Sequence, residues 1–151
     1  MKKTLFVLIT AMLVLAACAP AAEQSAEPVT EAALLVTVGD TQESFNAEGL
    51  EALPSTEATF KDVAYKGVTV SALLDSLSVD AGSVKAVKAI ASDGYAVNYD
   101  PAQVLKDNVI VAYALADGSP MSTDDGNFRM VLPDEEGKLN PRMLAELQII
   151  Q

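Results

Sequence analysis

The sequence contains no histidine, no tryptophan and a single cysteine, Cys18. Nucleophilic catalysis commonly pairs a serine or cysteine with an imidazole, and protein zinc sites are built largely from thiolates and imidazoles. The chain lacks the groups for both chemistries. A glycine-rich phosphate loop is also missing, so carboxylates are the only plentiful reactive side chains. Because one cysteine cannot form an intramolecular disulfide, packing alone has to stabilise the fold.

Basic residues are scarce as well. Ten lysines and arginines stand against 21 aspartates and glutamates, which gives a net charge of −11. Proteins bind nucleic acid by neutralising its phosphates with basic side chains, so we expect no nucleic-acid partner. An acidic surface is also repelled by anionic lipid headgroups. The charge therefore serves mainly to keep the protein soluble.

The sequence has no apolar run long enough to span a bilayer, which takes roughly 20 residues. The longest run covers residues 5–17 and is interrupted only by Thr10. It follows the short cationic start Met1-Lys2-Lys3. A cationic start and a short apolar run are the layout of a secretory signal. We therefore predict a signal peptide over residues 1–17.

The apolar run ends with Leu15-Ala16-Ala17-Cys18, which resembles the lipobox of bacterial lipoproteins. The resemblance implies a diacylglyceryl thioether on Cys18 and usually an acyl group on the new N-terminus. Two buried chains hold a protein stably at a membrane, whereas one chain holds it only marginally. The alternative is an ordinary cleaved signal with an incidental cysteine. We expect the mature protein to be anchored through Cys18 outside the cytoplasm, at the cell surface or on a periplasmic face.

A flexible tether is expected over residues 18–32. Its first part lacks large apolar residues and carries Pro20 and Pro28, so it cannot bury enough surface to offset the entropy of ordering. Apolar periodicity begins at about Ala33. The remaining length, residues 33–151, suits one domain.

Within this domain, short β-branched runs alternate with short helical patterns. Asn46 and Thr69 are expected to cap helices that end near Leu53 and Leu77, and Asp100-Pro101 is a favourable start for a third helix. Gly67 is expected to break the strand before it. The expected strands cover residues 34–38, 56–65, 84–91, 95–99, 109–115, 128–132 and 144–150.

The sum is an α+β domain with a mixed, sandwich-like β-sheet arrangement and about three short helices. Several short motifs then occur in a fixed order: GVTVSALL at 67–74, ASDGY at 91–95, VIVAY at 109–113, DGSPM at 117–121 and GNFRMVLP at 126–133. Together they resemble the oxidoreductase molybdopterin-binding domain, the core of sulfite-oxidase-like enzymes, in its short stand-alone bacterial form. The resemblance covers residues 34–150 and implies that family's α+β fold, with molybdopterin as its cofactor.

The sequence departs from that family where the metal would bind. The family holds molybdenum through a cysteine thiolate just before the first motif, because a soft sulfur ligand suits the metal–dithiolene centre. Residues 58–65 contain no cysteine, and residues 137–142 lack the family's lysine-tryptophan pair. Only Arg129 and Arg142 offer a fork for phosphate. We therefore expect a non-catalytic relative without catalytic residues, metal ligands or a resident cofactor.

Four residues are candidates for binding a ligand. Lys61 lies in the region that the metal thiolate would approach, unless it is simply an exposed strand lysine. Asp93 and Tyr95 lie in a loop near the family's functional face. Their alternative is a hairpin turn with Gly94 at positive φ and the tyrosine packed on the core.

The fourth candidate is Arg129, which a strand would project to the face opposite Phe128 and Met130. It is expected either to bind an anion or to form a structural ion pair with a carboxylate. The favoured function is thus a lipid-anchored module that binds a small ligand or a surface protein. A molybdopterin-dependent oxidoreductase, or an accessory subunit of one, is the alternative.

A weaker alternative is a calcium-dependent adhesive module. The acidic stretches at residues 124–126 and 134–137 could ligate a hard cation, although neither has EF-hand spacing. Solvated acidic turns are the simpler explanation of both stretches.

Overall fold

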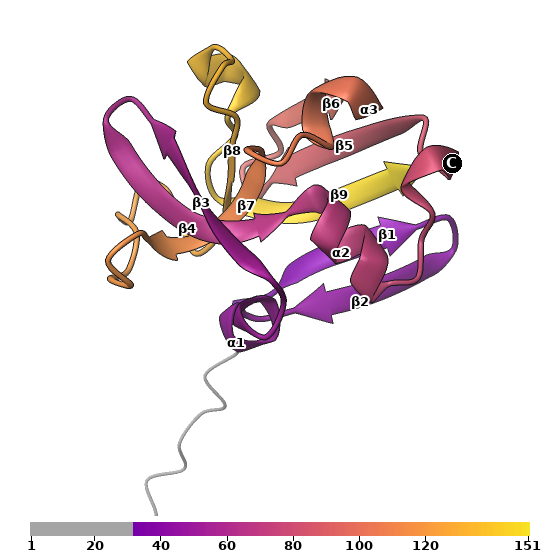
Figure 1. Ribbon diagram of the computed structural model, residues 1–151, viewed down its shortest axis with the longest axis horizontal. Helices are drawn as coiled ribbons and strands as arrows, with labels where there is room; N and C mark the ends of the chain where they lie inside the picture. Colours follow the sequence, from indigo (N-terminus) through magenta and orange to yellow (C-terminus); the bar gives the residue numbers. More distant parts are fainter. Residues whose placement is uncertain (1–31) are drawn as a thin grey trace, which may run out of the picture.

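Two β-sheets and three short α-helices form the part of the chain that the computed structural model describes, residues 32–151 (Figure 1). The predicted signal peptide, Cys18 and all of the predicted tether except Ala32 lie outside the described residues. The α+β class predicted from the pattern of short strands and helices is confirmed.

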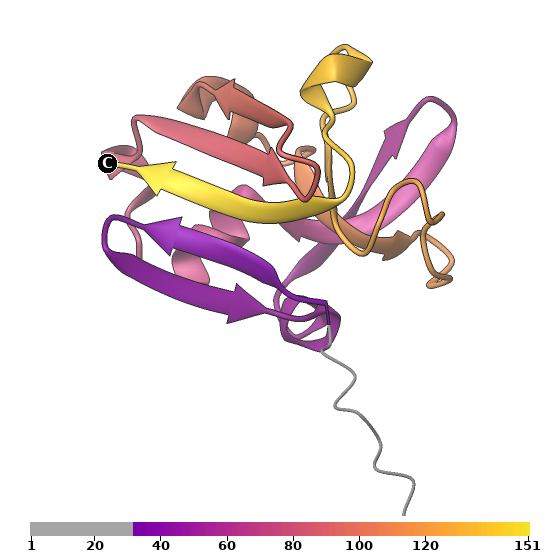
Figure 2. The same ribbon diagram turned by 180° about the vertical axis from the view of Figure 1, so that it is seen from behind.

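The five-stranded sheet has the order β2-β1-β9-β5-β6. β1 pairs in parallel with β9, and the other neighbours are antiparallel, so the sheet is mixed as expected. Figure 2 shows one face of this sheet without a covering helix. The strands are β1 (Leu34–Val38), β2 (Thr41–Phe45), β5 (Ala86–Ala91), β6 (Ala96–Tyr99) and β9 (Leu144–Ile150).

The four-stranded sheet has the order β3-β4-β7-β8 and is antiparallel throughout. Its first two strands form a hairpin that extends away from the five-stranded sheet in both views (Figures 1 and 2). The strands are β3 (Ser55–Phe60), β4 (Val63–Thr69), β7 (Ile110–Leu115) and β8 (Arg129–Val131).

Helices begin at the predicted caps. The Asn46 side chain accepts a hydrogen bond from the Gly49 amide at 2.8 Å, and Thr69 accepts one from Ala72 at 3.1 Å. Such caps satisfy amides that have no partner inside the helix. The helices are α1 (Ala47–Glu51), α2 (Val70–Ser76) and α3 (Pro101–Val104), with short 3-10 turns η1 (Ala81–Ser83) and η2 (Gly137–Leu139).

The main core joins both sheets and α2. On α2, Val70, Leu73 and Leu74 form a buried stripe. Neighbouring strand residues divide between this core and a smaller cluster on the other face of the four-stranded sheet, because successive side chains point to opposite faces. The smaller cluster consists of Ala58, Tyr65, Ile110, Ala112 and Val131.

The prediction of one strand over residues 56–65 is wrong. Lys61 and Asp62 form a two-residue turn between β3 and β4, with φ angles of 48° and 64°. Positive φ at both positions is the geometry of a type I′ hairpin turn, which usually carries Asn-Gly or Asp-Gly. This turn contains no glycine, so the usual sequence signal is missing. The correction matters because the turn places Lys61 at the tip of the hairpin.

Gly67 does not break the strand but lies inside β4. A Cβ atom there would lie 2.2 Å from the carbonyl oxygen of Val111 on β7. The register of the two strands also shifts between Lys66 and Gly67. The glycine therefore allows a close approach between two backbones, one of the reasons for glycine within a strand.

β2 was not among the predicted strands. Four of its five residues are exposed, and only Phe45 is partly buried. An edge strand with so little buried surface has no alternation of apolar and polar residues from which it could be predicted.

Candidate functional site

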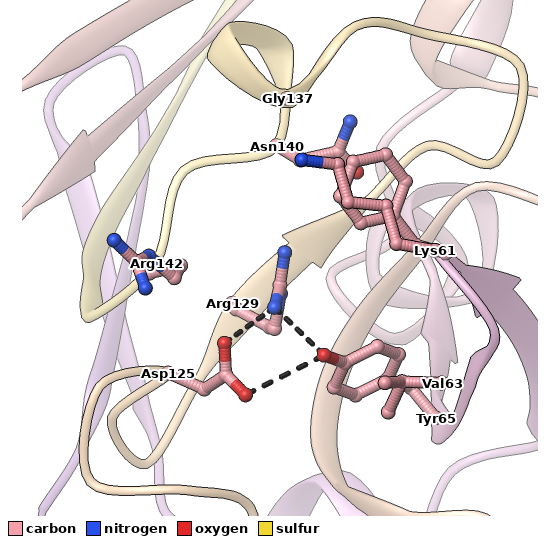
Figure 3. A pocket seen from close by; sticks show the side chains of 9 residues that line it. Lys61, Val63, Tyr65, Asp125, Arg129, Gly137, Asn140 and Arg142 are labelled. Atoms are coloured by element: carbon pink, nitrogen blue, oxygen red, sulfur yellow. Dashed lines mark hydrogen bonds and ion pairs between the residues drawn. The ribbon is translucent and has the colours of Figure 1, made fainter.

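A pocket of about 420 Å³ lies between the β3–β4 hairpin and residues 137–142, which lead into β9 (Figure 3). The hairpin provides one wall, the 137–142 segment provides the other, and two buried charged residues lie between them. The lining residues are Phe60, Lys61, Val63, Tyr65, Asp125, Arg129, Gly137, Asn140 and Arg142.

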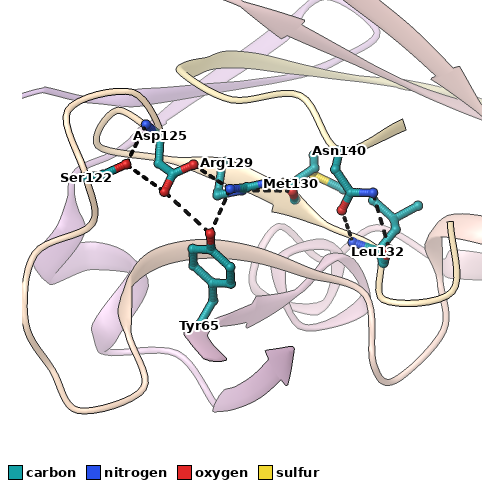
Figure 4. A network of polar contacts seen from close by, with 7 residues as sticks. All are labelled: Tyr65, Ser122, Asp125, Arg129, Met130, Leu132 and Asn140. Carbon is teal, nitrogen blue, oxygen red and sulfur yellow. Dashed lines mark hydrogen bonds and ion pairs between the residues drawn. The ribbon is translucent and has the colours of Figure 1, made fainter. Parts of the chain in front are cut away.

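A buried ion pair organises this pocket. Arg129 on β8 and Asp125 in the preceding loop are 4% and 8% exposed, and Nη1 of the arginine pairs with Oδ1 of the aspartate. Nη1 also donates a hydrogen bond to the Tyr65 hydroxyl at 2.8 Å. The aspartate's Oδ2 accepts from the Ser122 hydroxyl at 2.9 Å and from the Tyr65 hydroxyl at 3.4 Å (Figure 4). A buried ion pair is tolerated when additional hydrogen bonds satisfy its remaining polar atoms, as they do here.

Two aromatic rings further fix the guanidinium. Its carbon lies 4.7 Å from the centroid of the Tyr65 ring and 5.7 Å from that of Phe60. A cation over the face of a ring is attracted by the ring quadrupole. Burial raises the pKa of the Tyr65 hydroxyl, although the charge of Arg129 opposes this effect. The phenol therefore stays protonated at neutral pH and can donate to Asp125.

One nitrogen of the Arg129 guanidinium, Nη2, remains available to bind a ligand. Nε lies 3.4 Å from the Met130 carbonyl, and Nη1 binds Asp125 and Tyr65. Nη2 has no hydrogen-bond partner among residues 32–151. Figure 3 shows the guanidinium upright in the pocket, with one nitrogen pointing away from Asp125 and Tyr65.

Lys61 and Arg142 supply the unpaired positive charges of the pocket. Both are exposed, and neither forms an ion pair within the described part of the chain. The Lys61 ammonium lies 5.5 Å from the centroid of the Phe60 ring. Since Asp125 balances Arg129, these two side chains leave a local excess of positive charge in a protein of net charge −11.

Asn140 stabilises the 137–142 segment, which forms the wall opposite the hairpin. Its Oδ1 accepts a hydrogen bond from the Leu132 amide at 2.6 Å, and its Nδ2 donates to the carbonyls of Leu132 and Glu136. The side chain is 3% exposed. This residue could not be predicted from the sequence, because a buried asparagine that binds backbone eight residues away leaves no local pattern.

A second pocket of about 290 Å³ lies on the other side of the 137–142 segment. It shares Gly137, Asn140 and Arg142 with the first pocket. The four candidate residues are therefore divided. Lys61 and Arg129 line the first pocket, whereas Asp93 and Tyr95 line the second.

The Asp93 loop is a hairpin turn, as one alternative held. Gly94 has a φ of 87°, and Oδ1 of Asp93 accepts a hydrogen bond from the Tyr95 amide at 2.9 Å. The expectation that Tyr95 packs on the core is wrong, because its side chain is 46% exposed. Its hydroxyl instead donates to the Lys138 carbonyl at 2.7 Å. The buried tyrosine of this hairpin is Tyr99.

The acidic stretch at residues 124–126, a candidate for binding calcium, contains one buried and one exposed carboxylate. Asp125 is directed inward to Arg129, whereas its neighbour Asp124 is exposed. Among residues 32–151, no group of three or more histidine, cysteine, aspartate or glutamate side chains is placed to hold a metal ion.

Over residues 32–151, no helix has the length and apolar character needed to cross a membrane.

The residues of the first pocket do not fit a thiolate-bound molybdenum centre. The resemblance implies that the hairpin corresponds to the segment that carries the metal ligand in the family. It presents Phe60, Lys61, Val63 and Tyr65 to the pocket: an aromatic ring, an ammonium, an aliphatic group and a phenol. None is the soft sulfur donor that such a centre requires.

Comparison with known proteins agrees with this fold. The model of the oxidoreductase molybdopterin binding domain family matches residues 22–151, and the chain belongs to this family. It is also similar to the solved structure of the sulfane dehydrogenase SoxCD from Paracoccus pantotrophus, with a TM-score of 0.64 and 19% sequence identity. The match covers 78% of this chain and 38% of that one, so the likeness concerns the fold of one part of a longer protein. No curated protein matches the chain.

Proposed function

We propose that the protein is a lipid-anchored, extracytoplasmic binding module that takes up a small anionic ligand in the first pocket and does not catalyse a redox reaction. The observation that carries this proposal is the set of donors around the pocket. Lys61, Arg142 and the free Nη2 of Arg129 come from three separate parts of the chain and line one cavity. Hydrogen bonds from charged donors to anions are stronger than those between neutral groups.

The same residues support a role without catalysis. The pocket lies beside the segment where the family is expected to place its metal ligand, and the side chains there include no thiolate for molybdenum. The polar groups that remain can bind and orient an anion. A fold retained without its chemistry is consistent with a binding role, because function is set by the site and not by the fold.

Calorimetric titration with sulfate, phosphate and malonate tests the binding. We expect at least one of these anions to bind the wild-type domain in a one-to-one complex. Lys61→Gln and Arg142→Gln should each weaken the affinity roughly fivefold, since an exposed charge pair contributes up to about 1 kcal/mol. Lys85→Gln is the matched control, because Lys85 is exposed and lines neither pocket. No binding by the wild type, or equal losses in all three variants, would contradict the proposal.

Anchoring through Cys18 forms the second part of the proposal. It is supported by the lipobox-like Leu15-Ala16-Ala17-Cys18 and by the short apolar run before it. A tethered domain of net negative charge would approach the membrane through lipid and not through a basic face.

Family membership favours one other function, a molybdopterin-dependent oxidoreductase or an accessory subunit of one. Such a protein would have to hold its cofactor without a cysteine thiolate from the domain. Metal analysis of protein from its native host separates the two functions.

A further inference from the structure

The wall between the two pockets is a short irregular segment, and its position decides where Arg142 and Asn140 lie. Apart from η2, residues 137–142 contain no regular secondary structure. Asn140 ties the segment to its own loop through Leu132 and Glu136. The Met130 amide on β8 donates to the Pro141 carbonyl at 3.0 Å, which fixes the end of the segment next to Arg142. Other contacts must position the beginning of the segment, residues 137–139.

Those contacts include two tyrosine hydroxyls from the β5–β6 hairpin. The Tyr99 hydroxyl donates to the Leu139 carbonyl at 2.8 Å, and the Tyr95 hydroxyl donates to the Lys138 carbonyl at 2.7 Å. Tyr99 is also a core residue with 1% exposure, so its ring has a second role. Tyr95 is 46% exposed, and core packing does not explain its position.

The backbone around Tyr95 is arranged to aim this ring. The Asp93 carboxylate accepts the Tyr95 amide at 2.9 Å, and the Gly94 amide donates to the Ala91 carbonyl at 2.9 Å. The positive φ of Gly94, 87°, permits this tight turn. The hairpin therefore presents the phenol to a carbonyl 43 residues away along the chain.

We propose that Tyr95 is a positioning residue that holds residues 137–139 and thereby sets the wall of the first pocket at Gly137, next to Lys61. It acts through the segment and does not touch the ligand in the first pocket, since it lines only the second pocket. The inference rests on the proposed anion-binding function. Without the hydroxyl, water can satisfy the Lys138 carbonyl, so the fold loses little stability. The segment gains freedom, and the ligand then has to order it on binding, which lowers the affinity.

Tyr95→Phe tests this role because it removes the hydroxyl alone. We expect the affinity for the best-bound of sulfate, phosphate and malonate to fall roughly three- to tenfold, the range for one lost hydrogen bond. Amides of residues 137–139 should exchange faster with deuterium, while the melting temperature stays near that of the wild type. Tyr113→Phe is the matched control, because the Tyr113 hydroxyl is buried without a hydrogen-bond partner among the described residues. It should change neither the affinity nor the exchange.

A double-mutant cycle separates positioning from a general effect. If Tyr95 acts through Gly137, the losses from Tyr95→Phe and Lys61→Gln should be less than additive, since a Cβ atom at Gly137 would lie 3.6 Å from the Lys61 ammonium and coupled residues are not independent. The losses from Tyr95→Phe and Arg142→Gln should be closer to additive, because backbone hydrogen bonds of Pro141 with Met130 and of Met143 with Asp125 fix the neighbours of Arg142 separately.

Each other outcome overturns a defined part of the account. Unchanged affinity in Tyr95→Phe, with anion binding intact in the wild type, would overturn the positioning role and leave the proposed function standing. Weaker binding without faster exchange in residues 137–139 would show that Tyr95 touches the ligand, and would also overturn positioning. No anion binding by the wild type would overturn the proposed function and this inference together.

Discussion

At the scale of single residues, the ion pair of Arg129 and Asp125 determines which charges in the pocket are free. The carboxylate balances the guanidinium, and Tyr65 bridges both groups. The pairing leaves Nη2 of the arginine and the side chains of Lys61 and Arg142 to meet a ligand. Arg129 thus forms the structural ion pair that was one of its two alternatives, and its Nη2 is the candidate donor to an anion.

Replacing Asp125 by asparagine should be strongly destabilising. It leaves the buried Arg129 charge without its counterion, and breaking a buried ion pair on one side costs about 3–5 kcal/mol. Urea unfolding measures the loss. Asp124→Asn is the control, since Asp124 is exposed and lies next in sequence. Equal stability of the two variants would contradict the role assigned to the pair.

Two tyrosines should make the fold sensitive to alkaline pH. Burial raises the pKa of Tyr65 and, much more strongly, that of Tyr99, above the ordinary value of 10.0. A group whose pKa is raised on folding contributes stability below its unfolded pKa, and this contribution is lost as the pH rises beyond it. The free energy of unfolding should therefore fall above about pH 10.

Denaturant titrations between pH 8 and pH 11 check this expectation. Tyr99→Phe lowers the stability at pH 8 but should flatten its decline at higher pH, because the residue that resists ionisation most is gone. An equally steep decline in wild type and variant would show that other groups control the alkaline limit.

At the scale of elements, the close contact of β4 with β7 depends on Gly67. A Cβ atom at this position would lie 2.2 Å from the Val111 carbonyl oxygen, which is backbone and cannot rotate away. Gly67→Ala should therefore destabilise the domain by about 1–3 kcal/mol, the usual cost of overpacking.

Gly82→Ala provides the comparison for thermal unfolding. Gly82 is exposed in η1, and its nearest neighbour would be the Asp80 side chain at 3.4 Å, which can move. The Gly82 variant should melt close to the wild type. If Gly67→Ala melted at the same temperature as Gly82→Ala, β4 and β7 would be able to move apart without a loss of stability.

Elements with local signals were predictable, and elements defined by distant contacts were not. Asn46 and Thr69 identify their helices because a cap is a contact over three residues. The turn at Lys61 and Asp62 and the polar strand β2 carry no comparable signal. Their geometry is set by pairing with β4 and β1, not by their own composition.

The same distinction applies to the candidate site. Lys61 was identified from its place before the first motif and Arg129 from its strand position in the last motif, and they line one pocket. Asp93 and Tyr95 line another, because the 137–142 segment separates the two cavities. The link between Arg129 and Tyr65 spans 64 residues, so no local pattern could indicate it.

At the scale of the whole molecule, an acidic domain carries a pocket with a local excess of positive charge. The chain has a net charge of −11, yet Lys61 and Arg142 face one cavity without ion-pair partners in the described region. An anion in the pocket would provide the negative charge that these two side chains lack. The local positive charge sets the proposed binding site apart from the rest of an acidic surface.

Membrane attachment should depend on Cys18. In a bacterial host, the wild-type chain should sediment with membranes, and mass spectrometry of the mature N-terminus should find a diacylglyceryl group. Cys18→Ser should move the protein to the soluble or secreted fraction, because no thioether can form. A wild-type chain that carries a free thiol at Cys18 would contradict the anchoring proposal.

The central claim is that this family member has kept the fold and replaced its metal chemistry with anion binding. Molybdenum analysis of protein purified from its native host tests the claim most directly, with a pterin assay on the same sample. The account predicts molybdenum and pterin at trace levels, far below one equivalent per chain. Molybdenum close to one equivalent, bound tightly enough to survive purification, would contradict it.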